Sequence, residues 1–259
     1  MMRALRLLAV TFALATSLFA AEAGSAELKV LSTGSMRGVL QELTPAFEAA
    51  SGNRLKIEYS TAGDIEKKVA AGDEIDVVIL TKPRADKLVR EAKIVGGTET
   101  TLARAQLGLA TKKGAAKPDI SSVEAVKKAL LNAKSVAYPD PASGLTSESQ
   151  VIEKLGIAAE LKPKTRFVSA SGAQGPVNIG EVVERGEAEI GMQPIPLLMQ
   201  VQGIDILGPL PAELQSPDLI WVAGSPFFSE QPIAAKAFID FLADPKAAAV
   251  YKAKGLQPG

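Results

Sequence analysis

Four short polar turns hold most of the side chains in this sequence that could do chemistry. Each is rich in Ser, Thr, Gly or Pro, follows an apolar stretch and precedes a helical pattern; the turns are Ser32–Ser35, Ser60–Asp64, Pro139–Thr146 and Gly172–Pro176. Hydroxyls and unpaired backbone N–H groups at a helix start are hydrogen-bond donors, and the helix dipole adds a positive end. Such turns are suited to hold an anion, although Ser and Gly before a helix are also ordinary caps.

The residue types that are absent narrow the chemistry further. The 259 residues include no Cys and no His, which excludes thiol nucleophiles, serine–histidine triads and zinc sites of the usual ligand types. Any catalysis would depend on carboxylates, Lys, Arg, Tyr or hydroxyls, and we expect neither a metal site nor a cofactor. Lys+Arg and Asp+Glu both total 29, so no net charge draws the chain to nucleic acid or membrane surfaces.

Strands and helices alternate along the first third of the chain, which would position the first two turns at one edge of a sheet. Strands are predicted at 28–31, 54–59 and 76–80, and a helical pattern follows each. In the first of these helices the apolar positions fall on one face; they are Val39, Leu40, Leu43 and Phe47. Three such units in about 65 residues imply a parallel sheet with ligand sites at the carboxyl ends of its strands.

A second α/β series follows a strand predicted at 102–110. Its strands are expected at 135–138, 165–168 and 189–192, and a late strand at 218–223 precedes two terminal helices. This order favours two lobes over a single doubly wound sheet, each lobe being a mixed, mostly parallel sheet flanked by helices, with a ligand cleft between them. The first lobe is expected to comprise 27–104 plus 216–259, and the second 105–215.

The N-terminal residues are typical of a signal peptide. Arg3 and Arg6 precede the apolar run Leu7–Ala20, and small residues offer cleavage after Ala23 or Ala26. The run is too short for a comfortable membrane span, and no other stretch approaches the roughly 18 apolar residues that a span needs. We therefore expect a signal peptide over 1–26 and a soluble exported protein; the alternative is an N-terminal anchor.

Segments spread over nearly the whole mature chain resemble the periplasmic molybdate-binding proteins of ABC importers. They occur in the same order and are Leu28–Gly38, Glu58–Ile65, Ala71–Ile79, Asp140–Gly144, Val182–Gly191, Ala237–Leu242 and Tyr251–Leu256. The resemblance implies a type II periplasmic binding protein fold that closes on a tetrahedral oxyanion and presents it to a membrane permease. It also implies a periplasmic monomer with no nucleic-acid partner.

The family holds its oxyanion with Ser hydroxyls, backbone amides and usually a Tyr hydroxyl, and most of these groups have counterparts here. Transferred residue by residue, the resemblance assigns ligand binding to Ser35, Thr61, Ser143, Gly144, Gly175, Pro176 and Val177. Neutral donors are enough for a fully ionised oxyanion, because preorganised dipoles replace water without the burial of an opposite charge.

Two departures from the family pattern favour an organic polyanion as ligand. The expected Tyr after the strand at 189–192 is absent, Pro194 stands in its place, and Gln193 is an adjacent candidate. Arg37 is additional; its guanidinium could clamp a carboxylate with two hydrogen bonds, or it is a solvated residue of the first helical turn. Weaker candidates to supplement the site are Tyr138, Arg166 and Gln174.

The family also has relatives that act as periplasmic aconitate isomerases, which move a double bond. That reaction removes a proton beside a carboxylate-bearing alkene and returns one at another carbon, so it needs a base with a pKa near the working pH. Asp64 and Asp140 lie in suitable turns, although a helix cap and a turn former are their alternative roles, and Glu148 is expected to be a helix acid. Three functions stay open: an importer's binding protein, an isomerase and the ligand-binding module of a sensor.

Overall fold

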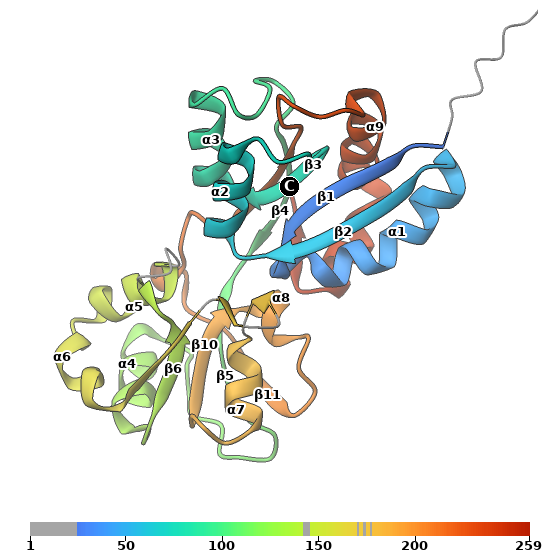
Figure 1. Ribbon diagram of the computed structural model, residues 1–259. Coiled ribbons are helices and arrows are strands. Elements are labelled where there is room, and N and C mark those ends of the chain that lie inside the picture. The colour runs from blue at the N-terminus through green and yellow to red at the C-terminus, as the bar shows by residue number, and fades with distance from the viewer. Residues whose placement is uncertain (1–24, 142–145, 170, 173–174, 177) are drawn as a thin grey trace, which may run out of the picture.

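The computed structural model describes residues 25–141, 146–169, 171–172, 175–176 and 178–259 (Figure 1). The expected signal peptide lies almost entirely outside these residues, and so do the candidate residues Ser143, Gly144, Gln174 and Val177. The described chain forms two α/β halves, each built on its own sheet. The predicted fold class is confirmed.

The first sheet contains the three parallel strands expected from the sequence. Its order is β13-β4-β12-β3-β1-β2, and its strands are β1 (Glu27–Thr33), β2 (Arg54–Ser60), β3 (Val77–Thr81), β4 (Thr100–Ala105), β12 (Ile220–Gly224) and β13 (Leu256–Pro258). β1 pairs in parallel with both β2 and β3, while β12 is antiparallel to β3 and β4. The carboxyl ends of β1, β2 and β3 therefore share one edge.

Helices cover both faces of this sheet. One face packs against α1 (Arg37–Ser51), α9 (Pro232–Ala243) and α10 (Ala248–Ala253), and the other against α2 (Ala62–Ala71) and α3 (Lys82–Arg90). The predicted apolar face of α1 is the buried one, and the Phe47 ring lies 4.8 Å from that of Phe238. Gly52 ends α1 in the left-handed conformation at φ 73°, which a glycine adopts without steric cost.

The second sheet has the order β11-β5-β10-β6-β7. Its strands are β5 (Leu107–Lys112), β6 (Val136–Pro139), β7 (Thr165–Val168), β10 (Ile190–Pro194) and β11 (Ile204–Pro209). Its helices are α4 (Val123–Asn132), α5 (Ser147–Leu155), α6 (Ala158–Leu161), α7 (Ile179–Glu184) and α8 (Ile195–Leu198). A short hairpin of β8 (Ser171–Gly172) and β9 (Gly175–Pro176) precedes α7. None of the described helices is long and apolar enough to cross a membrane.

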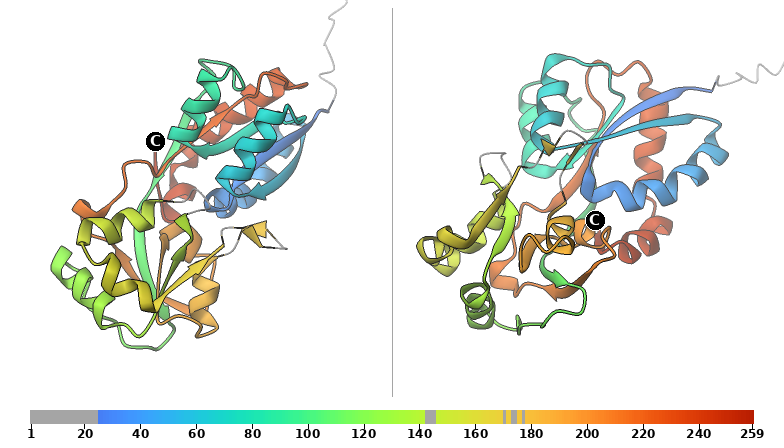
Figure 2. Two further views of the ribbon diagram at one scale, coloured as in Figure 1. Left: turned by 60° about the vertical axis from the view of Figure 1, so that its left-hand side comes forward. Right: turned by 60° about the horizontal axis from the view of Figure 1, so that its bottom comes forward.

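The chain passes between the halves where one continuous strand was predicted. That prediction, 102–110, is wrong: the strand breaks at Gln106, so that β4 and β5 belong to different sheets (Figure 2). The Gln215 side chain accepts a hydrogen bond from the Leu107 N–H (2.8 Å) and donates to the Leu107 and Leu210 carbonyls (3.1 and 2.8 Å). One amide thus ties the outgoing connection to the returning one.

Asp76 is a buried carboxylate that joins the first sheet to the loop before α9. It is 4% exposed and accepts hydrogen bonds from the Lys29 N–H (2.8 Å), the Ser229 hydroxyl (2.9 Å) and the Gln231 N–H (3.1 Å). Buried donors that lose their acceptor cost the full desolvation penalty. The carboxylate therefore stabilises the packing of this loop on the sheet.

We predict that Asp76→Ala lowers the free energy of unfolding by about 2–4 kcal/mol, since it leaves several donors unpaired. Urea denaturation at pH 7 measures the change. Asp86→Ala is the matched control, because Asp86 forms only a surface pair with Lys82 (2.7 Å) one helical turn away. The control should change stability by less than about 0.5 kcal/mol, and similar small losses in both variants would contradict the prediction.

Candidate functional site

The first polar turn lies at the carboxyl end of β1, where the two halves meet. Gly34–Met36 form a 3-10 turn (η1) that packs against α8 of the second half. The Gln200 side chain donates to the Gly34 carbonyl (3.0 Å), and a Cβ on Gly34 would lie 3.3 Å from the Leu197 side chain. Ser35 is 5% exposed, and no other described residue hydrogen-bonds to its hydroxyl. Among the residues that the structure describes, Ser35 is therefore a buried donor at the junction.

Arg37 begins α1 directly after this turn and stacks on an aromatic ring. Its Cζ atom lies 4.2 Å from the centre of the Tyr59 ring, near the end of β2. Burial raises the pKa of Tyr59, and the positive charge of Arg37 opposes this shift. Stacking on Tyr59 fixes the plane of the Arg37 guanidinium. Within the described part of the chain Arg37 forms no ion pair, so the N–H edge of its guanidinium has no carboxylate partner there.

The second half reaches the same region through its hairpin. β9, which contains the candidate residues Gly175 and Pro176, lies beside β2. The hairpin therefore crosses from the second half to the strand that bears Tyr59. This places three candidate positions of the sequence analysis beside β2: Arg37, Gly175 and Pro176.

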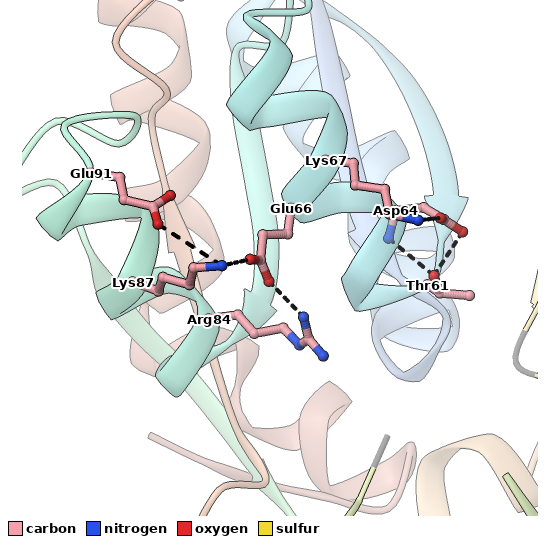
Figure 3. A network of polar contacts seen from close by, with 7 residues as sticks. All are labelled: Thr61, Asp64, Glu66, Lys67, Arg84, Lys87 and Glu91. Atoms are coloured by element: carbon pink, nitrogen blue, oxygen red, sulfur yellow. Dashed lines mark hydrogen bonds and ion pairs between the residues drawn. The ribbon is translucent and has the colours of Figure 1, made fainter. Parts of the chain in front are cut away.

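Thr61 and Asp64 bind each other at the start of α2 (Figure 3). The Thr61 hydroxyl accepts the Asp64 N–H (3.2 Å) and donates to the Asp64 carboxylate (2.8 Å), while the Lys67 ammonium lies 3.5 Å from that carboxylate. Thr61 is thus the N-cap of α2, and its hydroxyl proton is directed at Asp64. Asp64 lies in the first turn of α2 as the partner of this cap, which is close to the capping role that the sequence left open for it.

We predict that Thr61→Val lowers the free energy of unfolding by about 1 kcal/mol, because it removes the cap of α2. Thr61→Ser keeps the hydroxyl and should have the stability of the parent protein. Thermal unfolding followed by circular dichroism compares the two variants. Equal unfolding temperatures for the Val and Ser variants would contradict the role of the cap.

A second guanidinium at this edge of the sheet was missed by the sequence analysis. Arg84 lies in the first turn of α3, after β3, and its Nη1 donates to the Glu66 carboxylate (2.6 Å), which also binds the Lys87 ammonium (Figure 3). Burial acts to raise the pKa of Glu66, but the hydrogen bonds from Lys87 and Arg84 outweigh it and lower the pKa. Arg84 follows the third parallel strand just as Ser35 and Thr61 follow the first two. This repeated position after a strand is the signal in the sequence that could have identified Arg84.

In the second half, the start of α7 is capped from within. The side-chain oxygen of Gln193 accepts a hydrogen bond from the Ile179 N–H (3.0 Å). The Asn178 side chain accepts one from the Gly180 N–H (2.8 Å) and donates one to the Leu197 carbonyl (2.7 Å). Gln193 is 3% exposed. Its side-chain oxygen therefore holds α7 against β10, which is a positioning role for this candidate.

The remaining polar candidates of the second half lie on the paired strands β6 and β7 or directly after them. Asp140 follows β6 and donates its N–H to the Val168 carbonyl (2.9 Å). Tyr138 packs edge-on against Phe167, with ring centres 5.3 Å apart, and Arg166 forms an exposed ion pair with Glu187 (3.0 Å). Of these, Asp140 alone lies in one of the four polar turns.

Glu148 is a buried carboxyl at the start of α5, directly after the third polar turn. It is 2% exposed, and the Ser147 hydroxyl donates to its Oε2 atom (2.8 Å). Burial raises its pKa to about 7, against the opposing hydrogen bonds from Ser147 and from its own backbone N–H. The bond to its own N–H places the carboxyl at the N-terminal end of α5. The sequence indicated only a helix acid, because the burial of this side chain comes from tertiary packing.

The donor set has the chemistry of an anion site. In the described residues no group of three or more His, Cys, Asp or Glu is arranged to hold a metal ion. The junction instead offers a buried hydroxyl at Ser35, and α1 begins there with the stacked guanidinium of Arg37. Arg84 adds a second guanidinium at the start of α3. A carboxyl that titrates near neutral pH, Glu148, begins a helix of the opposite half.

Comparisons with known proteins identify the relatives of this chain. Residues 28–257 match the family model of bacterial extracellular solute-binding proteins. An aconitate isomerase from Pseudomonas sp. is 34% identical over 236 residues, which cover 89% of this chain and 87% of that protein. The molybdate-binding protein ModA of Azotobacter vinelandii is 26% identical over 250 residues, 94% of each chain. The structure of an Azotobacter vinelandii periplasmic molybdate-binding protein is similar with a TM-score of 0.71 and 22% identity, over 88% of this chain and 98% of that one.

Proposed function

The chain belongs to the family of bacterial extracellular solute-binding proteins, and from this premise we propose that it binds a small organic polycarboxylate between its two halves. The observation that supports this ligand class is the stacked guanidinium of Arg37, 4.2 Å from the Tyr59 ring centre. A planar guanidinium matches a carboxylate with two parallel hydrogen bonds, whereas a tetrahedral oxyanion is held well by neutral donors alone. The aconitate isomerase relative acts, by its name, on a tricarboxylate.

The proposed site combines both halves of the molecule. Ser35 and Arg37 supply donors from the first half, and Ser143, Gly144, Gly175, Pro176 and Val177 are the proposed contacts from the second. In this proposal the two lobes, 27–104 plus 216–259 and 105–215, close on the ligand in the periplasm after removal of a signal peptide. The closed form then presents the ligand to the permease of an ABC importer.

Ligand-induced thermal stabilisation of the purified mature protein tests the ligand class. A tight ligand stabilises the folded state by mass action, by about 2.7 kcal/mol at one hundred times its dissociation constant. We expect citrate and the two aconitates to raise the unfolding temperature, and sulfate, phosphate, molybdate and tungstate to do so far less. Stabilisation by micromolar molybdate without any response to the carboxylates would overturn the proposal.

A second candidate function, isomerisation of aconitate, is favoured by the position and pKa of Glu148. The base takes a proton from the methylene carbon, the double bond moves by one carbon, and the same proton or one from water is delivered to the former vinyl carbon. No proton is gained or lost overall. With no His in the chain, a carboxyl whose pKa is about 7 suits both transfers, whereas Asp64 is held in the cap of α2.

Exchange with heavy water tests this candidate. The protein would be incubated with trans-aconitate in deuterium oxide, and proton resonance spectra would follow both the cis isomer and the loss of methylene signal. We expect both changes for the parent protein and for Glu153→Gln, an exposed position on the same helix. Glu148→Gln should abolish them. A parent protein that binds trans-aconitate yet shows neither change would overturn the enzymatic candidate and leave the binding function in place.

A further inference from the structure

The short helix α8 of the second half supports the first polar turn, which belongs to the other half. We infer that Gln200, two residues after this helix ends, is a positioning residue that fixes the peptide unit in front of Ser35. The inference rests on the proposed function, because it presupposes that Ser35 binds the ligand. It goes further by giving the second half a role in shaping the donor set of the first.

α8 is held firmly within the second half. The Leu198 side chain is fully buried in the apolar cluster that also contains Val182 of α7. The Leu197 carbonyl accepts a hydrogen bond from the Asn178 side chain (2.7 Å), which also caps α7. α8 therefore moves together with α7 as part of the second half.

The segment around α8 also contacts the first half at two places. The Gln200 side chain donates to the Gly34 carbonyl (3.0 Å) and to the carbonyl of Pro196 in α8 (3.1 Å). At the second place the backbone comes close at Gly255, where a Cβ would lie 2.6 Å from the Met199 sulfur. Figure 1 shows α8 at the top of the second half, where it adjoins the first. Gln200 therefore reaches the first turn from an element that is docked on the first half at another point as well.

The hydrogen bond from Gln200 acts on the peptide unit that joins Gly34 to Ser35. The Gly34 carbonyl and the Ser35 N–H belong to one planar trans unit and point in opposite directions, so fixing the carbonyl also fixes the N–H. Glycine has the greatest conformational freedom of any residue, so this peptide gains most from a restraint. The same carbonyl accepts the Arg37 N–H within the turn, and Gln200 occupies its second lone pair.

The entry to the turn is fixed from within the first half. The indole N–H of Trp221 donates to the Thr33 hydroxyl (2.7 Å), and both residues are buried. Ser35 thus lies between this bond and the start of α1, and Gln200 holds the intervening Gly34 peptide from the opposite half. Donors that are already in place lower the ordering cost of ligand binding, which is how a support of this kind raises affinity.

Isothermal titration calorimetry with citrate and trans-aconitate tests the inference. Gln200→Met keeps the length of the side chain but cannot donate to Gly34. It should weaken both carboxylates by about 3- to 10-fold, the net value of one hydrogen bond. Gln202→Ala is the matched control, because Gln202 is an exposed glutamine in the loop after α8. This control should change the affinities by less than about twofold, and a loss equal to that of Gln200→Met would overturn the inference.

A double-mutant cycle with Ser35→Ala separates the positioning of Ser35 from a general effect on the fold. In the Ser35→Ala background, the loss caused by Gln200→Met should be at least about twofold smaller than in the parent protein, because part of what Gln200 positions is gone. Losses that simply multiply in the double variant, or unchanged affinity in Gln200→Met, would overturn the inference.

Titration of molybdate and sulfate distinguishes a failure of the inference from a failure of the proposed function. If the parent protein binds one of these oxyanions and neither carboxylate, the proposed ligand class is wrong. The same cycle measured with that oxyanion then decides the role of Gln200, since Ser35 is a donor for either kind of anion. A parent protein that binds none of these anions would overturn the proposed function and the inference with it.

Discussion

Replacing Arg37 by Ala is expected to weaken the binding of citrate and trans-aconitate by about 100-fold, the loss typical of one partner of a desolvated charge pair. The physical reason is the geometry at the end of β2: the Tyr59 ring fixes the guanidinium plane at 4.2 Å, and its edge has no carboxylate partner among the described residues. Sulfate affinity, where measurable, should change by less than about fivefold, because Ser35 and backbone amides suffice for a tetrahedral anion. Isothermal titration calorimetry measures the affinity for the two carboxylates and for sulfate.

Two further variants separate a specific contact from a general effect of charge. Arg54 is a cation at the start of β2, the strand that also contains Tyr59. Its side chain is 73% exposed and lies 3.4 Å from Glu48, so Arg54→Ala should leave citrate binding unchanged. Tyr59→Leu removes the stacking partner while the charge of Arg37 remains, so an intermediate loss is expected. Equal losses of citrate and sulfate affinity in Arg37→Ala would show that Arg37 acts through overall charge or structure.

Glu148→Gln is expected to stabilise the protein above neutral pH. Burial raises the pKa of Glu148 from the ordinary 4.5 to about 7, so the folded state binds this proton more tightly than the unfolded state does. The stability that comes from this group is therefore fully present below pH 4.5 and is lost as the pH rises through 7. The pKa difference corresponds to about 3 kcal/mol at most, and Gln does not ionise.

Urea denaturation between pH 5 and pH 8.5 measures this effect. The free energy of unfolding of Glu148→Gln should exceed that of the parent protein at pH 8.5, and the difference should shrink toward pH 5. Glu153→Gln on the exposed side of the same helix should show no such pH-dependent difference. A Gln variant that is less stable than the parent protein at every pH would show that the carboxyl is not held at a raised pKa.

Both residues carry a cost to the stability of the folded protein. A buried carboxyl that destabilises the folded state at neutral pH is unusual unless its proton is used. Arg37 is a cation at the N-terminus of α1, where the helix dipole disfavours positive charge. Arg37 therefore opposes the local preference of its helix start, whereas the cost of Glu148 comes from its burial. An anionic ligand that pairs with Arg37 would account for the first of these costs.

Local patterns predicted most of the secondary structure, because the apolar periodicity of each element matches its burial. The face of α1 defined by Val39, Leu40, Leu43 and Phe47 is an example. β11 was not predicted, because Gly208, at φ 125°, and Pro209 interrupt its alternation at a bulge. The break at Gln106 also escaped prediction, because strand-like residues continue on both sides of it and only the partner strands distinguish β4 from β5.

The positions of the polar turns were predictable, but the contacts of their side chains were not. Ser35, Thr61 and Arg37 follow strands whose carboxyl ends meet, as the pattern indicated. The hydrogen-bond partners of these polar groups depend on contacts of the folded state. The Thr61 hydroxyl donates to Asp64, and the side-chain oxygen of Gln193 accepts from the start of α7. Arg84 was missed for the same reason, since its environment comes from Glu66, and Glu148 was expected as a helix acid without its tertiary burial.

The Gln215 amide that ties Leu107 to Leu210 has a consequence for how the molecule moves. Two connections fastened at one level act as a single pivot and not as two independent tethers. A hinge opening of the two halves bends both connections together and keeps the hydrogen bonds of the Gln215 amide. Twisting or sliding one half against the other would break these hydrogen bonds. Gln215 therefore couples the two connections, so that a movement of one half relative to the other must bend both of them together.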